Sequence, residues 1–280
     1  MEKIAFLTDS TSGIRVDEYD DVFIVSLGTI IDGKEYIDNK DIETDDFYML
    51  LEKNGDGAKT FQPSPEAFES TYQKIVNLGY THVIAIHASK ELTGTFNQSQ
   101  MISQQFEIET TVIDSKIGDY PLRRMIEEAI KLKNTNASYD KIVNQVLKYT
   151  EKPKLILSPK NLDQLKKSGR LSRSQSIIAG ILNIQLVIEF DDGKIYPIKK
   201  SRTKKKSWEF IHKKLIKDIN NDRPSKIGVS YAGSKEGLEE LVNWLKQQFP
   251  QKTIDTYPLV PVAGVHTGFG TIAISWIQEF

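Results

Sequence analysis

The chain has 280 residues, of which 39% are hydrophobic and 27% are charged, and these ordinary values exclude wholesale disorder. It contains no cysteine, which excludes disulfides, thiolate metal sites and a cysteine nucleophile, and which suits a reducing compartment. No stretch approaches the roughly 18 to 20 apolar residues of a membrane span, and acidic and hydroxyl residues come too early for a signal peptide. We therefore expect a soluble, cytoplasmic protein.

The net charge of −1 conceals a strong asymmetry along the chain. Residues 1–60 contain 15 acidic and 6 basic residues, whereas residues 160–217 contain 15 basic and 5 acidic residues. A basic block of this kind predicts an anionic partner, such as nucleic acid, a lipid surface, a phosphorylated ligand or an acidic protein. A solvated basic face is an equally good interpretation. Aromatic residues are sparse in the block, which disfavours stacking on single-stranded nucleic acid.

Strands and helices alternate in the first half of the chain. Helical spacing of apolar residues begins after Ser64 and Pro65, which form a good helix start with serine as the N-cap. Further helices are expected after 93–95 and over 120–132 and 138–149, and strands over 3–7, 22–27, 82–87 and 110–114. This alternation predicts a doubly wound, mostly parallel sheet of the α/β class.

The second half changes character. Asn161 is expected to cap a short helix that ends at Gly169, and the turn at 191–193 (Asp-Asp-Gly) predicts a hairpin between 184–190 and 194–199. The second half is completed by helices around 208–219 and 234–249, a strand over 226–231 and a closing segment over 260–277. These elements predict an α+β domain with an antiparallel or mixed sheet. A boundary at Pro153 gives domains 1–152 and 153–280.

Three loops rich in hydroxyl groups follow predicted strands, at 8–12, 60–64 and 93–95. The carboxyl ends of strands form the ligand crevice of a doubly wound sheet, and hydroxyl and backbone N–H groups at a helix start suit an anion. One such loop is weak evidence, because turns and caps use the same residues. Three at one sheet edge predict a site for phosphate or carboxylate.

His266 lies among glycines 264, 268 and 270, in what we interpret as a loop that lets the backbone approach a ligand. A structural histidine is an equally good interpretation. The four histidines have no metal-ligand spacing, and there is no phosphate-binding loop, dinucleotide fingerprint or nucleophile elbow. The residues alone thus predict a two-domain α/β protein that binds a small anion, with no metal.

The order of these motifs resembles the DegV family of bacterial fatty-acid-binding proteins over nearly the whole chain. The matching segments are Thr-Asp-Ser-Thr-Ser at 8–12, Tyr-Ile-Asp at 36–38, the acidic 45–48, Thr-Phe-Gln-Pro-Ser-Pro at 60–65, 89–97, Asp-Ser at 114–115, 162–172 and His-Thr-Gly-Phe-Gly at 266–270. Each motif is weak alone, but the ordered set is specific.

The resemblance implies a long-chain fatty acid in a buried apolar tunnel between the two domains, with no cofactor and no catalysis. It also implies that the carboxylate is presented to a separate, ATP-dependent fatty acid kinase whose acyl phosphate product serves phospholipid metabolism. By the same resemblance, the residues around the ligand would be Thr60, Phe61, Thr93, Gly94, Arg170 and His266.

The chain departs from the family pattern at several positions. Phe61 replaces a usual Ser or Thr and cannot hydrogen-bond a carboxylate, whereas Thr93 replaces a usual Ser and keeps the hydroxyl. Segment 116–121 replaces small residues and glycines, and residues 185–186 replace a Lys-Pro pair. Either the head group of the ligand lies in a different position from that implied by the family pattern, or the ligand is not an ordinary fatty acid.

Two alternatives from other functional classes stay open. The first is a phosphotransferase or hydrolase that uses Asp9, Ser10 or His266, and the second is a nucleic-acid-binding protein that uses the basic block over 160–217. Within that block, apolar residues 177–182 follow Arg170 and further bases, which predicts a transient contact with an anionic membrane. The competing interpretation is that 177–182 packs in the core.

Overall fold

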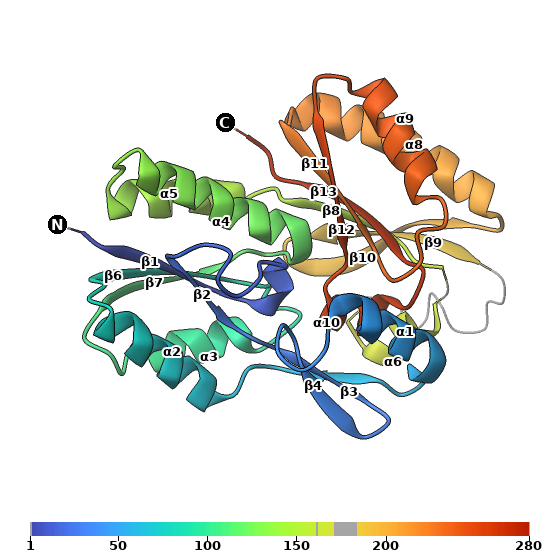
Figure 1. The fold of residues 1–280 in the computed structure, drawn as a ribbon. Coiled ribbons are helices and arrows are strands. Elements are labelled where there is room, and N and C mark those ends of the chain that lie inside the picture. Colours follow the sequence, from blue (N-terminus) through green and yellow to red (C-terminus); the bar gives the residue numbers. More distant parts are fainter. Residues whose placement is uncertain (1, 161, 171–183, 280) are drawn as a thin grey trace.

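The computed structural model describes residues 2–160, 162–170 and 184–279, which form three β-sheets with flanking helices (Figure 1). The first sheet has four parallel strands in the order β2-β1-β6-β7. Their bounds are β1 Ile4–Asp9, β2 Val22–Val25, β6 His82–His87 and β7 Glu109–Asp114. The short 3-10 helix η1 (Ser10–Ser12) follows β1 directly.

Helices cover both faces of this sheet, α4 and α5 one face and α2 and α3 the other (Figure 1). Strand β1 is buried on both faces, so its alternate residues enter two different cores. Ile4 and Phe6 pack with the apolar sides of α4 and α5, whereas Ala5 and Leu7 pack with α2 and α3. The helices span α2 Pro65–Asn77, α3 Thr95–Ser103, α4 Asp119–Asn134 and α5 Tyr139–Tyr149.

The second sheet has six strands in the order β10-β9-β8-β13-β11-β12, with every pair antiparallel except β11 and β12. The strands are β8 Lys154–Ser158, β9 Gln185–Asp191, β10 Lys194–Ser201, β11 Lys226–Tyr231, β12 Thr253–Pro258 and β13 Ile272–Trp276. Helices α8 (Lys204–Asp222) and α9 (Leu238–Gln248) bury their apolar sides on one face. The other face receives α6 (Asp163–Ser168), α10 (Pro261–Thr267) and residues from the first part of the chain.

The third sheet is small, antiparallel and ordered β4-β3-β5, with strands β3 Gly28–Ile31, β4 Lys34–Ile37 and β5 Lys59–Phe61. Helix α1 (Thr44–Asn54) lies beside it and packs Phe47, Tyr48 and Leu51 into the core over the second sheet. The small sheet was not predicted. Its strands are only three or four residues long, and β4 is partly exposed, so the alternation of apolar residues is too short to recognise.

The predicted fold class is confirmed: the first sheet is parallel and the second is mixed. The predicted hairpin at 191–193 is also confirmed, as the β9–β10 pair. The strand expected over 22–27 is shorter and ends at Val25. The domain division at 152/153 stays a prediction, although β8 begins at Lys154. The expected cap Asn161 and the segment 171–182 lie outside the described residues. No helix in the described ranges is long and apolar enough to cross a membrane.

Candidate functional site

A cavity of about 470 Å³ lies among loops of the first sheet, the small sheet and the open face of the second sheet. All six residues expected at the ligand line it: Thr60, Phe61, Thr93, Gly94, Arg170 and His266. They come from four separate places in the chain, and the fold brings them to one cavity. Their role in ligand binding stays a prediction, because the structure holds no ligand.

Thr60 and His266 are joined across 206 positions of sequence. Thr60 pairs with Thr29 in the middle of the β3–β5 ladder, and its Oγ1 lies 2.9 Å from Nε2 of His266. His266 lies in the last turn of α10, not in a loop as expected from its glycines. Pro261 begins this helix, and the buried side chains of Val262 and Val265 hold it against the core.

The electrostatics of this end of the cavity favour a neutral histidine. Burial, together with the nearby positive charge of Arg170, lowers the pKa of His266 to about 4. The cation of the group is therefore Arg170, whose Nη1 donates to the carbonyl of Ser168 at 2.7 Å. A neutral imidazole beside a hydroxyl and a guanidinium can hydrogen-bond an anionic head group without itself carrying charge.

Thr93 and Gly94 form the start of α3. The Thr93 and Thr95 hydroxyls lie 2.9 Å apart, and Gly94 is the N-cap residue with no side chain to occupy the first N–H groups of the helix. A Cβ on Gly94 would lie 2.2 Å from Oε1 of Gln62, so a larger residue here would displace the end of that side chain. This arrangement leaves hydroxyl and backbone donors at the cavity wall, where an anion is stabilised.

Phe61 gives the cavity an apolar surface where a hydroxyl was expected from the family pattern. Its ring packs onto Gly28 of β3 so closely that a Cβ there would lie 2.1 Å from Cζ. The ring thus occupies the space that a side chain on β3 would need. Phe61 contributes contact area to the cavity and no hydrogen bond.

The rest of the cavity is mainly apolar, and sequence reasoning did not identify these lining residues. They are Leu27, Ile117, Leu155, Leu157, Phe190, Ile195, Leu259, Val260 and Val262. Each belongs to a strand, helix or loop whose apolar pattern indicates only a core position. Val260 and His266 are six residues apart at the two ends of α10, so at 1.5 Å per residue the cavity extends about 9 Å along this helix.

Asp119 is the charged residue that the unusual segment 116–121 places at this cavity. It is 5% exposed, and its Oδ2 accepts a hydrogen bond from Ser230 at 2.6 Å. Burial raises the pKa of Asp119 to about 6. A carboxyl group therefore lies in the wall of an otherwise apolar region, held by a partner on the second sheet.

The residues of the enzyme alternative do not meet at the cavity. Neither Asp9 nor Ser10 is among its lining residues. Asp9 instead accepts hydrogen bonds from Ala88 N at 2.9 Å and contacts Nδ1 of His87 at 3.1 Å, while Nε2 of His87 lies 2.9 Å from Ser99 Oγ. This Asp-His-Ser chain is fully buried, so it joins the ends of β1 and β6 to α3 and has no access to a substrate. Among the described residues, no group of three or more His, Asp or Glu side chains could hold a metal ion.

Comparison with known proteins adds evidence from outside the chain. A family model described as an uncharacterised protein of the DegV family matches residues 3–279. A DegV domain-containing protein of Staphylococcus aureus (strain N315) is 30% identical over 281 residues, covering all of both chains. A DegV domain-containing protein of Clostridium acetobutylicum is 30% identical over 285 residues with the same coverage.

Solved structures share the fold over the full chain. A fatty-acid-binding DegV family protein from Streptococcus agalactiae superposes with a TM-score of 0.91 at 25% identity and covers 100% of both chains. A stearic acid-binding protein from Eubacterium ventriosum gives a TM-score of 0.87 at 24% identity and covers 99% of this chain and 98% of its own.

Proposed function

This chain belongs to the DegV family, and from that premise and the geometry of the cavity we propose that it binds one long-chain fatty acid. The observation that carries the proposal is the composition of the cavity wall. Hydroxyl, imidazole and guanidinium groups gather around Thr60, Thr93, His266 and Arg170, and the remaining wall is mainly apolar. A carboxylate attached to a hydrocarbon tail has the same division into a polar and an apolar part.

The energetics favour this class of ligand over a small anion. Each methylene group removed from water contributes about 0.8 kcal/mol, so a long tail supplies most of the affinity. The head group has the donors at the start of α3, the Thr60 hydroxyl and the charge of Arg170. The fatty-acid-binding relative from Streptococcus agalactiae, which shares the fold over its whole length, supports the assignment.

We further propose that the protein is a carrier and not a catalyst. In this role it presents the bound carboxylate to a separate, ATP-dependent fatty acid kinase in the cytoplasm, and the acyl phosphate enters phospholipid metabolism. Arg170 supports this role, because it lines both the cavity and a neighbouring surface pocket with Glu91 and Lys194, so the head group lies near the outside. Formation of acyl phosphate by the loaded carrier, its kinase and ATP is the direct measurement.

Native mass spectrometry of protein purified from bacteria tests the binding proposal. We expect one retained molecule of about 250–300 Da, the size of a fatty acid that fills an elongated apolar site. In titrations of the delipidated protein, Thr93→Val should weaken fatty acid binding by about 1.5–3 kcal/mol, because it keeps the shape and removes a hydrogen bond to a charged group.

The matched control is Thr253→Val, since Thr253 is an exposed residue on the edge strand β12, and its fatty acid affinity should equal that of the wild type. Protein that retains no lipid and gains none in titration would contradict the proposal. Turnover of ester or phosphate substrates would favour the enzyme alternative, and salt-sensitive binding of oligonucleotides would favour the nucleic-acid alternative.

A further inference from the structure

Helix α10 carries His266 in the second half of the chain, yet it packs against elements from the first half. It contacts α1, the small-sheet strands β3 and β5, and η1, as well as α6. The helix has only seven residues, so it is too short to be stable by itself and takes its position from its neighbours. The place of His266 at the polar end of the lipid cavity therefore depends on what fixes α10.

The peptide group between Leu259 and Val260, just before α10, is bound on both sides by side chains from the first half of the chain. The hydroxyl of Tyr48 donates to the carbonyl of Leu259 at 2.7 Å. The carboxylate of Asp119 accepts a hydrogen bond from the backbone N–H of Val260. Leu259 and Val260 are 1% and 5% exposed, so their peptide group is shielded from water and depends on these two partners. Together the two bonds fix where α10 begins.

Tyr48 also fixes how closely α10 approaches α1. Its side chain is fully buried, and a Cβ on Gly264 would lie 2.5 Å from its Oη and 2.7 Å from its Cε1. A tyrosine ring is rigid, so glycine is needed where the ring meets the helix. Two residues further along, Nε2 of His266 lies 2.9 Å from the hydroxyl of Thr60 on β5. A shift of α10 relative to Tyr48 would therefore change the contact between His266 and Thr60.

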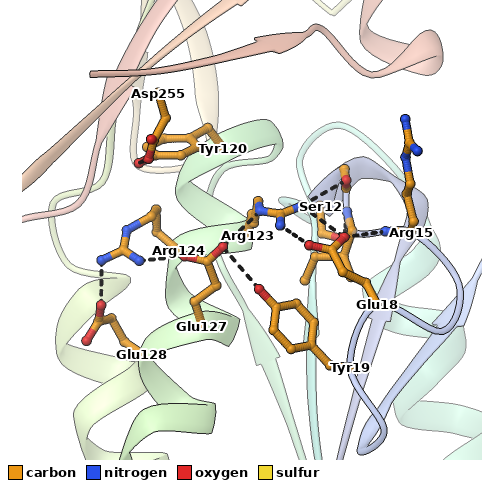
Figure 2. A network of polar contacts seen from close by, with 12 residues as sticks. Ser12, Arg15, Glu18, Tyr19, Tyr120, Arg123, Arg124, Glu127, Glu128 and Asp255 are labelled. Carbon is orange, nitrogen blue, oxygen red and sulfur yellow. Dashed lines mark hydrogen bonds and ion pairs between the residues drawn. The ribbon is translucent and has the colours of Figure 1, made fainter. Parts of the chain in front are cut away.

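Asp119 is a fixed partner, because the start of α4 is held from two directions. Tyr120, the next residue, donates its hydroxyl hydrogen to Asp255 of β12 at 2.7 Å. Arg123, one turn further along α4, binds the carboxylate of Glu18 from the loop between η1 and β2 (Figure 2). These contacts join α4 both to the second sheet and to the first part of the chain, so the Asp119 carboxylate is held in one position.

We infer that Tyr48 and Asp119 are positioning residues for the lipid head group, which they orient through the 259–260 peptide group and α10. The inference rests on the proposed binding of a fatty acid. Tyr48 is not among the residues that line the lipid cavity, so it acts on the head group through the helix. With the peptide group fixed, His266 and Thr60 keep their geometry before the ligand arrives, and a site arranged in advance loses less affinity to the ordering of its side chains.

A double-mutant cycle of fatty acid affinity, measured on delipidated protein, tests the inference. Tyr48→Phe keeps the ring and removes the hydroxyl, and it should weaken fatty acid binding about fivefold, the effect of losing one ordinary hydrogen bond. In the His266→Gln background the same change should weaken binding less than about twofold, because the helix no longer presents an imidazole. A residue that merely stabilises the fold would weaken binding equally in both backgrounds. The matched control is Tyr72→Phe, since Tyr72 is also fully buried but packs in the core of the first sheet, and its fatty acid affinity should equal that of the wild type.

A second readout needs no lipid. NMR titration of the His266 ring should show a neutral imidazole at pH 5 in the wild type and partial protonation in Tyr48→Phe. A displaced α10 exposes the ring to water, so the pKa of His266 rises from about 4 towards its ordinary value of 6.5. Asp119→Gly should act in the same way, since glycine suits the φ of +56° at this position and leaves the Val260 N–H without its acceptor. Asp119→Asn keeps an acceptor oxygen and should restore most of the wild-type titration.

Two outcomes would overturn the inference. The first is a His266 titration that is unchanged in both Tyr48→Phe and Asp119→Gly. The second is an equal loss of affinity from Tyr48→Phe with and without the imidazole. A wild-type protein that binds no fatty acid would instead contradict the proposed function, and the NMR titration would still decide whether Tyr48 and Asp119 position His266. If Asp119→Gly fails to fold, Tyr48→Phe decides the result, because it removes only one hydroxyl group.

Discussion

His266 has surroundings that favour its neutral form, and this has a measurable consequence for stability. Its pKa in the folded protein, about 4, lies below the ordinary value of 6.5 that the unfolded chain retains. Between these values the unfolded state binds the extra proton, so the free energy of unfolding falls as the pH drops from 6.5 to 4. One proton changes it by at most about 1.4 kcal/mol per pH unit.

We expect His266→Gln to remove this part of the pH dependence. Urea unfolding of the lipid-free protein at pH 7 and pH 5 should show a smaller loss of stability for the variant than for the wild type. Identical losses in the two proteins would mean that His266 is protonated in the folded state. Thr60→Val is a useful companion, because it removes the 2.9 Å hydroxyl contact without changing the charge.

At the residue scale, the polar half of the site could be predicted and the apolar half could not. The hydroxyl-rich segments that contain Thr60 and Thr93, and His266 among its glycines, are chemically conspicuous in the sequence, and the resemblance to the family then assigns these residues to the ligand. The apolar wall could not be identified, because Leu155 or Phe190 at a cavity has the same sequence pattern as one in a solid core. The sequence also could not predict that Asp38 Oδ1 has no hydrogen-bond partner among the described residues, since this depends on which residues surround it.

At the scale of elements, β3 and β5 shape the cavity through one close contact. The Phe61 ring lies over Gly28, and this contact exists only because glycine has no side chain. Gly28→Ala should force the ring away from β3, at a cost of about 1–3 kcal/mol for overpacking. Because Phe61 lines the cavity, we expect the displaced ring to weaken fatty acid binding as well.

The double variant Gly28→Ala with Phe61→Ser tests whether the clash with the Phe61 ring causes the loss of stability and the loss of fatty acid binding. The smaller serine removes the clash, so stability should recover, and the added hydroxyl restores a donor for the carboxylate. Chemical unfolding measures the stability, and fatty acid titration the affinity, of the wild type, Gly28→Ala and the double variant. Equal stability of Gly28→Ala and the wild type would show that the ring has room elsewhere.

Long elements were predicted more reliably than short ones. The alternating strands and helices of the first sheet repeat their apolar spacing over enough residues to be recognised, as do the β9–β10 hairpin and α8. The third sheet has strands of three or four residues, and α10 contains Gly264, which is typical of loops. Both depend on tertiary contacts: a Cβ on Gly264 would lie 2.5 Å from the Tyr48 hydroxyl of α1.

At the scale of the whole molecule, the charge asymmetry of the sequence is only partly neutralised by the fold. Lys160 and Lys204 both pair with Glu236, and Lys214 lies 2.9 Å from Glu189 and 2.8 Å from Asp218. These pairs are local to the second half of the chain. Between the two regions, Lys167 of the basic block pairs with Asp56, so the acidic first 60 residues cancel only a small part of the block through the contacts described.

The exposed lysines 205 and 206 at the start of α8 test whether the basic block meets an anionic membrane. No ion pair of either is found within the described ranges, and each cation near an anionic surface contributes about 1 kcal/mol. We expect the protein to float with vesicles that contain anionic lipid at low salt and to be released at high salt. Neutralising both with Lys205→Gln and Lys206→Gln should lower the partition coefficient roughly 30-fold.

The control for this experiment is a pair of lysines from the acidic first part of the chain. Lys53→Gln with Lys59→Gln removes the same net charge from exposed positions outside the basic block, so its flotation should match that of the wild type. If both double variants lose binding equally, only net charge matters. If neither loses binding, or the wild type does not float at all, the basic block is a solvated face, and the carrier exchanges its lipid without using α8 to approach a membrane.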